Sequence, residues 1–129
     1  MSPDGRDAGS LQHMLTSIAR IRDYTAGLDR RTFSQVPVVQ DAVIRQLMVL
    51  GEAANRVSPS MQARSADVPW RDIIGLRNVI VHQYDKLNLE RIWVAVADDL
   101  PAVEKLISDL LASADRESQS SESALDERG

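Results

Sequence analysis

The chain has no cysteine, and only 4% of its 129 residues are aromatic. Disulfides therefore contribute nothing, and the core must be built from Leu, Ile, Val, Ala and Met. No apolar run approaches the roughly 20 residues that span a bilayer. The N-terminal MSPDGRDAGS has no apolar segment of the kind found in secretory signals. These absences predict a soluble, cytoplasmic protein with one core and no membrane partner.

A strong excess of one charge is also missing from most of the chain. The formal net charge is −4, but residues 113–129 hold five acids and two bases. The first 112 residues therefore hold 14 acids and 13 bases. A body so close to neutral argues against broad electrostatic binding to duplex nucleic acid, although it leaves room for a local basic site.

Apolar residues spaced three and four apart run through almost the whole chain, which is typical of helices. One such segment spans residues 11–28, with Gly27 as its predicted stop. The longest spans residues 38–57. A third, WRDIIGLRNVIVH, follows Asp67, a predicted cap, and its Gly75 predicts close packing of another backbone. The pattern predicts an all-α bundle of four or five helices without a strand.

The two ends of the chain lack this periodicity. Residues 1–10 are polar and are predicted to be a flexible N-terminus. The segment SADRESQSSESALDERG, residues 113–129, is rich in Ser and acids and is predicted to be a disordered acidic tail. A single helical domain is therefore expected over residues 11–112.

Short signals divide this domain into its helices. Thr32 and Gln35 have capping-box spacing and predict one helical turn. Ser58 and Asn88 each precede a helical pattern and are predicted N-caps. Pro101 lies inside the last pattern, where its missing N–H should kink or divide the helix.

One short apolar run, RNVIVHQYD, carries four polar groups: Arg77, Asn78, His82 and Tyr84. On a regular helix Arg77 and His82 point about 140° apart, whereas Asn78 and His82 share a face. This fits a helix that ends near His82, or a groove reached from two sides such as a dimer seam. Histidine transfers protons near neutral pH, and arginine binds phosphate with two parallel hydrogen bonds.

Each of these groups also has an ordinary structural interpretation. Arg77 can pair with a carboxylate, and His82 can stabilise a helix C-terminus through the dipole. Tyr84 can be a half-buried packing residue with a solvated hydroxyl. Trp70 and Trp93 are interpreted as packing residues rather than base-stacking ones. Spacing alone leaves the catalytic and the structural interpretations of the motif open.

A resemblance to a known family favours the catalytic interpretation. The R-x4-H-x-Y pattern of Arg77, His82 and Tyr84 resembles the signature of the HEPN superfamily, specifically its HepT-like (DUF86) branch. QDAVIRQLMVLGEAANRVSP, VPWRDIIGLRN and LERIWVAVADDLP occur in the order and spacing typical of that branch. The resemblance covers residues 11–111. It implies a HEPN-type bundle of four or five helices that dimerises around a shared cleft.

The resemblance also implies a function, that of the toxin in a type VII-like toxin–antitoxin pair. The toxin would be a metal-independent endoribonuclease without a cofactor. Arg77 would hold the RNA phosphate, His82 would transfer protons and Asn78 would orient the site. Attack by the RNA 2′-hydroxyl would leave a 2′,3′-cyclic phosphate. Gln83 stands where the family more often has glycine, which bears on catalytic efficiency.

The resemblance implies a regulatory partner as well. An MntA-like nucleotidyltransferase antitoxin would transfer AMP from ATP to Tyr84. The added bulk and negative charge would repel an RNA phosphate from the cleft, by the same electrostatics as phosphorylation.

The long helix carries a polar stripe made of Asp41, Arg45 and Glu52. Its ordinary interpretation is a solvated face with an ion pair worth about 0.3 kcal/mol. Its place in the family-like segment predicts instead that these residues line or support the cleft. Two other functions remain as alternatives: a non-catalytic dimeric binding module that docks a nucleotidyltransferase, and a plain dimerising scaffold.

Overall fold

The computed structural model describes the backbone of residues 4–128 and the side chains of residues 5–117 and 119. Its long helices are α1 (Asp4–Thr25), α3 (Pro37–Arg56), α5 (Trp70–His82) and α7 (Leu100–Arg128). Its short elements are α2 (Arg30–Phe33), α4 (Pro59–Ala63), the 3₁₀ turn η1 (Tyr84–Lys86), α6 (Leu89–Val94) and the π-helical η2 (Ala95–Asp99). No strand occurs within residues 4–128, so the predicted all-α fold is confirmed.

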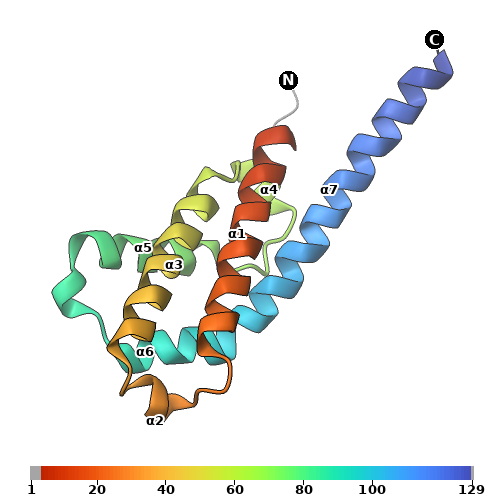
Figure 1. The fold of residues 1–129 in the computed structure, drawn as a ribbon. Coiled ribbons are helices and arrows are strands. Elements are labelled where there is room, and N and C mark those ends of the chain that lie inside the picture. The colour runs from red at the N-terminus through yellow and green to blue at the C-terminus, as the bar shows by residue number, and fades with distance from the viewer. Residues whose placement is uncertain (1–3, 129) are drawn as a thin grey trace.

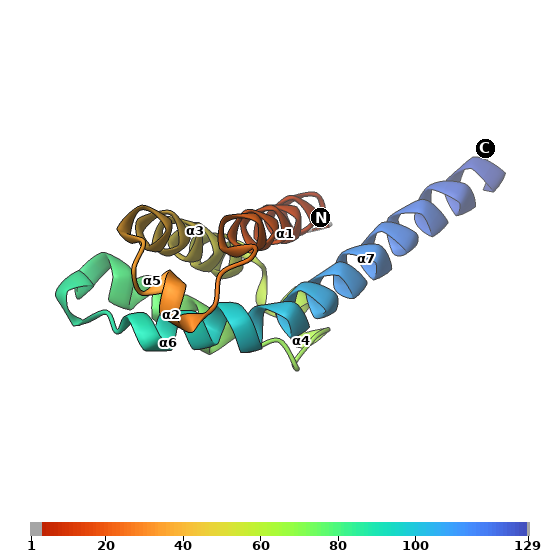
Figure 2. The ribbon, with the colours of Figure 1, turned by 60° about the horizontal axis from the view of Figure 1, so that its bottom comes forward.

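The helices pack as an open bundle around α1 and α3. These two lie side by side and run in opposite directions, with α2 at the turn between them (Figure 1). α3 lies between α1 and α5, and α1 in turn contacts α7. Figure 2 shows α1 and α3 as one layer, with α5 and α6 in a second layer beneath it. None of the helices described is long and apolar enough to cross a bilayer.

The core is aliphatic, as the composition predicted. Its fully buried side chains include Leu11, Met14, Ile21, Val43, Leu50, Ile92 and Ile107. Burial of each such side chain contributes about 1.5–3 kcal/mol to folding. Trp70 is buried and donates to the Ser65 carbonyl at 3.1 Å, while Trp93 packs against Phe33 with ring centroids 5.2 Å apart and ring planes tilted by 35°. Both tryptophans are therefore packing residues.

The N-terminal segment differs from the prediction of a flexible region over residues 1–10. α1 begins at Asp4, and residues 1–3 lie outside the described residues. Asp7 is 1% exposed, and its carboxylate accepts hydrogen bonds from the Ser58 amide at 2.9 Å and the Ser58 hydroxyl at 2.7 Å. This contact joins α1 to the junction of α3 and α4, a partner that local composition could not reveal.

The C-terminal segment also differs from its predicted disorder. α7 continues to Arg128 and runs beyond the rest of the bundle (Figure 1); Gly129 lies outside the described residues. Ala114 is buried, and Arg64 donates to the Ser113 hydroxyl at 2.9 Å and to the Glu117 carboxylate. The helix of residues 100–112 thus propagates into the acidic segment, where Arg64, the residue after α4, supplies contacts.

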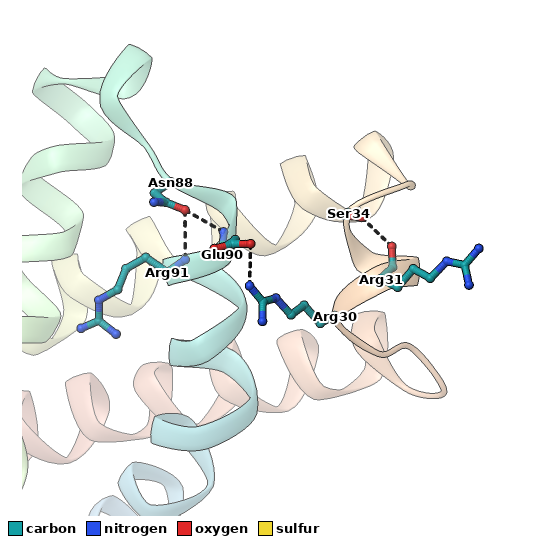
Figure 3. A network of polar contacts seen from close by, with 6 residues as sticks. All are labelled: Arg30, Arg31, Ser34, Asn88, Glu90 and Arg91. Carbon is teal, nitrogen blue, oxygen red and sulfur yellow. Dashed lines mark hydrogen bonds and ion pairs between the residues drawn. The ribbon is translucent and has the colours of Figure 1, made fainter.

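Two of the predicted caps are confirmed and one is wrong. The Ser58 hydroxyl accepts from the Met61 amide at 3.2 Å. The Asn88 side chain accepts from the first amides of α6, and Figure 3 shows these bonds beside the ion pair that joins Arg30 of α2 to Glu90 of α6. Asp67 does not cap α5, which begins at Trp70 with no side-chain cap.

The single turn α2 was predicted, but a different pair of residues caps it. Asp29 accepts from the Thr32 amide at 2.8 Å, and the Thr32 hydroxyl accepts from the Asp29 amide at 2.8 Å. The bond from the Thr32 amide, then that from its hydroxyl, lowers the pKa of the Asp29 carboxyl. The predicted pair of Thr32 and Gln35 does not form the capping box.

The irregularity predicted at Pro101 lies in the turn before it. α6, η2 and α7 form one continuous rod, in which residues 95–99 are π-helical. Proline has no amide hydrogen and crowds the preceding turn, so the hydrogen-bond register changes there.

Candidate functional site

The motif segment forms the end of α5, which approaches α3 very closely at Gly51. A Cβ placed on Gly51 would lie 2.2 Å from the Arg77 Cβ and 3.1 Å from the Ile73 carbonyl oxygen. Only glycine fits there, and its missing side chain lets α3 hold the Arg77 backbone in place. The sequence predicted this close approach at Gly75, which is wrong, because a Cβ there would meet nothing within 4 Å.

Arg77 is positioned by two neighbouring side chains. Its guanidinium Nη2 lies 3.8 Å from Glu52 Oε1 of α3, and its Nη1 donates to Asn78 Oδ1 at 3.0 Å. Arg77 and Glu52 thus form an ion pair, but their separation is too long for a hydrogen bond. The buried Nε atom has no hydrogen-bond partner in the described part of the chain. The guanidinium is therefore held in place with much of its donor capacity unused.

His82 is the last residue of α5, which is one of the two arrangements that its spacing from Arg77 left open. The helix ends at Gln83, whose φ and ψ are −140° and 44°, and η1 follows. The imidazole is exposed. Five helical positions place it about 7.5 Å along the axis from Arg77 and about 140° around it. Arg77 packs toward α3, whereas His82 faces solvent at the end of the helix.

Tyr84 opens η1, directly beyond His82. Its side chain is 55% exposed, and Val81 beside it on α5 is 42% exposed. The only other tyrosine of the chain, Tyr24, lies in the last turn of α1 and is 38% exposed. Tyr84 is thus the more exposed tyrosine of the two, and it lies two residues beyond the motif histidine.

The polar stripe on α3 is only partly brought to the motif. Glu52 reaches Arg77, but Asp41 and Arg45 are exposed, and no ion pair joins them to the motif among the described residues. Gly51 was missed as a site residue although a glycine within an apolar helical pattern is a recognised sign of close approach. The sequence offered two such glycines and no means to choose between them.

The motif therefore carries three groups suited to RNA chemistry. Arg77 is a cation that can bind phosphate, His82 has an imidazole that can transfer protons, and Asn78 has an amide that contacts Arg77. Among the described side chains, those of residues 5–117 and 119, no group of three or more His, Asp or Glu is placed to hold a metal ion.

Comparisons with known proteins relate the chain to ribonucleases. The family profile described as "Ribonuclease HepT-like" matches residues 14–110. "Putative RNase MJ1380" of Methanocaldococcus jannaschii is 30% identical over 95 residues, which cover 74% of this chain and 87% of that protein. "Putative RNase TTE0752" of Caldanaerobacter subterraneus subsp. tengcongensis is 28% identical over 101 residues, covering 78% and 90%. "Probable ribonuclease HepT" of Thermococcus cleftensis is 26% identical over 93 residues, covering 72% and 84%. No solved structure matches the chain.

Proposed function

The chain belongs to the HepT-like ribonuclease family, and from this premise we propose that it is a metal-independent endoribonuclease of the toxin type. The observation that carries the proposal is the state of Arg77. Its guanidinium is fixed between Glu52 and Asn78, yet Nε has no partner and Nη2 makes no hydrogen bond to Glu52. Nε is buried, but the side chain as a whole is 30% exposed, so a phosphate can approach the terminal nitrogens of the guanidinium.

The proposed reaction is attack within the RNA. His82 removes the proton of a 2′-hydroxyl, the oxygen attacks the adjacent phosphorus, and the bond from phosphorus to O5′ breaks. A proton delivered to O5′ completes the step, leaving a 2′,3′-cyclic phosphate and a 5′-hydroxyl. Arg77 stabilises the charge that develops on the phosphate oxygens, and Asn78 orients the guanidinium.

A homodimer supplies the second proton carrier in this proposal. Because Arg77 and His82 point in different directions on α5, two copies of the motif facing one cleft bring both groups to one phosphate. We place the seam on the long helix α3 and the motif helix α5. Exposed apolar side chains on both support it: Val38 of α3 is 79% exposed and Val81 of α5 is 42% exposed. Sedimentation at micromolar concentration tests the dimer, and a monomer would contradict it.

Cleavage of RNA by the purified protein tests the reaction. We expect His82→Ala to lower the rate about 10²–10⁴-fold, the usual contribution of general acid–base catalysis. The matched control is His13→Ala, because His13 is the only other histidine and is exposed on α1. The products should carry 2′,3′-cyclic phosphate ends, and EDTA should leave the rate unchanged.

Other outcomes separate the alternatives. Cleavage at the wild-type rate in His82→Ala would end the catalytic assignment, and loss of cleavage with EDTA would indicate a metal mechanism. A folded wild-type protein that binds RNA or a partner without cleaving would favour the non-catalytic binding module.

Tyr84 is the proposed site of control by a nucleotidyltransferase antitoxin of the MntA-like class. Its 55% exposure, two residues from His82, supports access by an enzyme that transfers AMP from ATP. Each added AMP places a phosphodiester charge near Arg77, which then pairs with that phosphate instead of the RNA.

The effect of Tyr84→Phe tests this control. The variant should keep RNase activity but escape modification and neutralisation, while Tyr24→Phe should remain sensitive. Mass spectrometry after incubation with the partner and ATP locates the modification. AMP found on Tyr24 with Tyr84 unmodified would contradict the proposal, and an inactive Tyr84→Phe would place the hydroxyl in the catalytic set.

A further inference from the structure

A groove lies beside the first part of α5, where Asp72, Ile73 and Leu76 contribute to its lining. It has a volume of about 470 Å³, and its walls come from α3, α5, η2 and the start of α7. Its floor is apolar and consists of Leu47, Leu50, Ile73, Leu76, Val103 and Leu106. None of the proposed catalytic residues lines it. It is therefore a feature separate from the ribonuclease site.

The rim of this groove is acidic. Asp67, Asp72, Asp98 and Asp99 line its mouth and are all exposed. Arg91 is the only basic residue in the lining, and its Nη1 lies 3.6 Å from Asp99 Oδ2. Figure 3 shows Arg91 extending from the side of α6 opposite to Arg30. In the described part of the chain, Asp67, Asp72 and Asp98 have no ion-pair partner, so the mouth carries an uncompensated negative charge.

The π-helical segment forms part of this mouth. Ala95, Asp98 and Asp99 all belong to η2 and line the groove. π turns are rare in helices and often occur at functional sites. Here the changed register presents two carboxylates together beside an apolar floor.

The shape of the groove indicates what it binds. Its lining along η2 and α7 extends from Ala95 to Leu106, a length of about 16 Å at 1.5 Å per residue. That is three turns of helix, the length over which an amphipathic helix lays its apolar face into a groove. RNA is excluded as the occupant, because the uncompensated carboxylates repel its phosphates and the floor offers no cation.

We propose that this groove is a docking site for an amphipathic helix of a partner protein. The helix places apolar side chains on the floor, and Lys or Arg beside them pairs with Asp67, Asp72 and Asp98. Charge complementarity selects the partner, and the apolar floor supplies most of the affinity.

A displayed library of twelve-residue helices tests the proposal. The library has Leu at the positions of one face and random residues at the flanking positions, and it is selected on the full chain. Peptides that also bind Ala102→Trp are discarded, because Ala102 is an exposed lining residue whose enlargement blocks the groove from its edge. We expect the remaining peptides to be enriched in Lys and Arg.

Fluorescence anisotropy of a selected peptide then measures affinity. Asp72→Asn and Asp98→Asn should each weaken binding roughly two- to five-fold, and added salt should weaken it further. Asp23→Asn, an exposed aspartate on α1 outside the groove, is the matched control and should bind as the wild type does. RNA cleavage should be unchanged in all of these variants, so the test is independent of the ribonuclease proposal.

Four results would overturn the proposal. The first two concern the selection: peptides enriched in Asp and Glu, or no peptides that bind the wild type and not Ala102→Trp. The third is equal affinity of a selected peptide for the wild type and for Asp72→Asn and Asp98→Asn. The fourth is a change of oligomeric state in Ala102→Trp. The last would assign the groove to contact between copies of this chain. If Ala102→Trp does not fold, the affinities of the selected peptides for the wild type and for the double variant Asp72→Asn/Asp98→Asn are compared instead, and equal affinities would overturn the proposal.

Discussion

The two sides of α5 are chemically opposite, although they belong to one helix of 13 residues. On one side Arg77 packs against Gly51 of α3 with unused hydrogen-bond donors. On the other side Asp72 stands at the rim of an apolar groove. The first side suits a phosphate and the second repels one. A nearly neutral body can therefore contain a cationic group and an acidic rim in different places, because net charge averages over them.

The largest expected effect is on the cationic side, at Arg77. Arg77→Ala should lower RNA cleavage about 10²–10³-fold, the usual cost of removing one group that stabilises developing charge. Arg71→Ala is the control, because Arg71 is an exposed arginine of the same helix. Initial rates on one RNA substrate, with circular dichroism to check folding, measure the difference. Equal losses in the two variants would mean that general charge matters and the motif does not.

The next effect concerns the contact that holds Arg77 in place. Gly51→Ala should destabilise the fold by about 1–3 kcal/mol, because the new Cβ overlaps the Arg77 Cβ and forces α3 and α5 apart. Gly75→Ala should instead stabilise by about 0.5–1 kcal/mol, since a helical glycine there has open space around it. Urea unfolding of both variants measures the contrast. Similar free energies of unfolding for the two would show that the close approach is not a constraint.

A smaller effect is expected at Glu52, the carboxylate nearest to Arg77. The side chains of Arg77 and Glu52 are 30% and 38% exposed, so loss of the pair in Glu52→Gln should change stability by less than about 1 kcal/mol. The variant should lower KM for RNA roughly two- to five-fold, because Glu52 competes with the phosphate for the guanidinium. It should also lower kcat, because Arg77 is less firmly positioned. Steady-state kinetics measure KM and kcat separately. An unchanged KM would argue against competition between Glu52 and the RNA phosphate for Arg77.

The smallest effect is expected far from both sides of α5, at the cap of α2. The folded-state pKa of Asp29 lies below its ordinary value of 3.8, so its contribution to stability is present above that pH. The contribution is lost as the pH falls through the lowered pKa. Melting temperatures of wild type and Asp29→Asn should therefore differ slightly at pH 5 and converge as the pH falls below 3.8. A difference that grows toward low pH would contradict the cap.

The sequence predicted the interior helices well and the two ends poorly. Periodic apolar residues identify a helix that has a core to face, and Ser58 and Asn88 cap the helices that follow them through bonds to residues two and three positions away. Asp7 and Arg64 are different, because the partners that order the ends lie 51 residues away for Asp7 and 49 and 53 residues away for Arg64. No local pattern reports such contacts.

The sequence by itself determined the fold class, the end of the motif helix at His82 and the set of polar groups in the motif. These depend on local spacing and residue chemistry, which are complete within a few turns. Only the tertiary structure decided that Gly51 rather than Gly75 meets another helix, that Glu52 alone of the polar stripe reaches Arg77, and that four aspartates surround one groove. Each of these depends on how two or more helices are placed against each other, and that placement is fixed by the packing of the whole core.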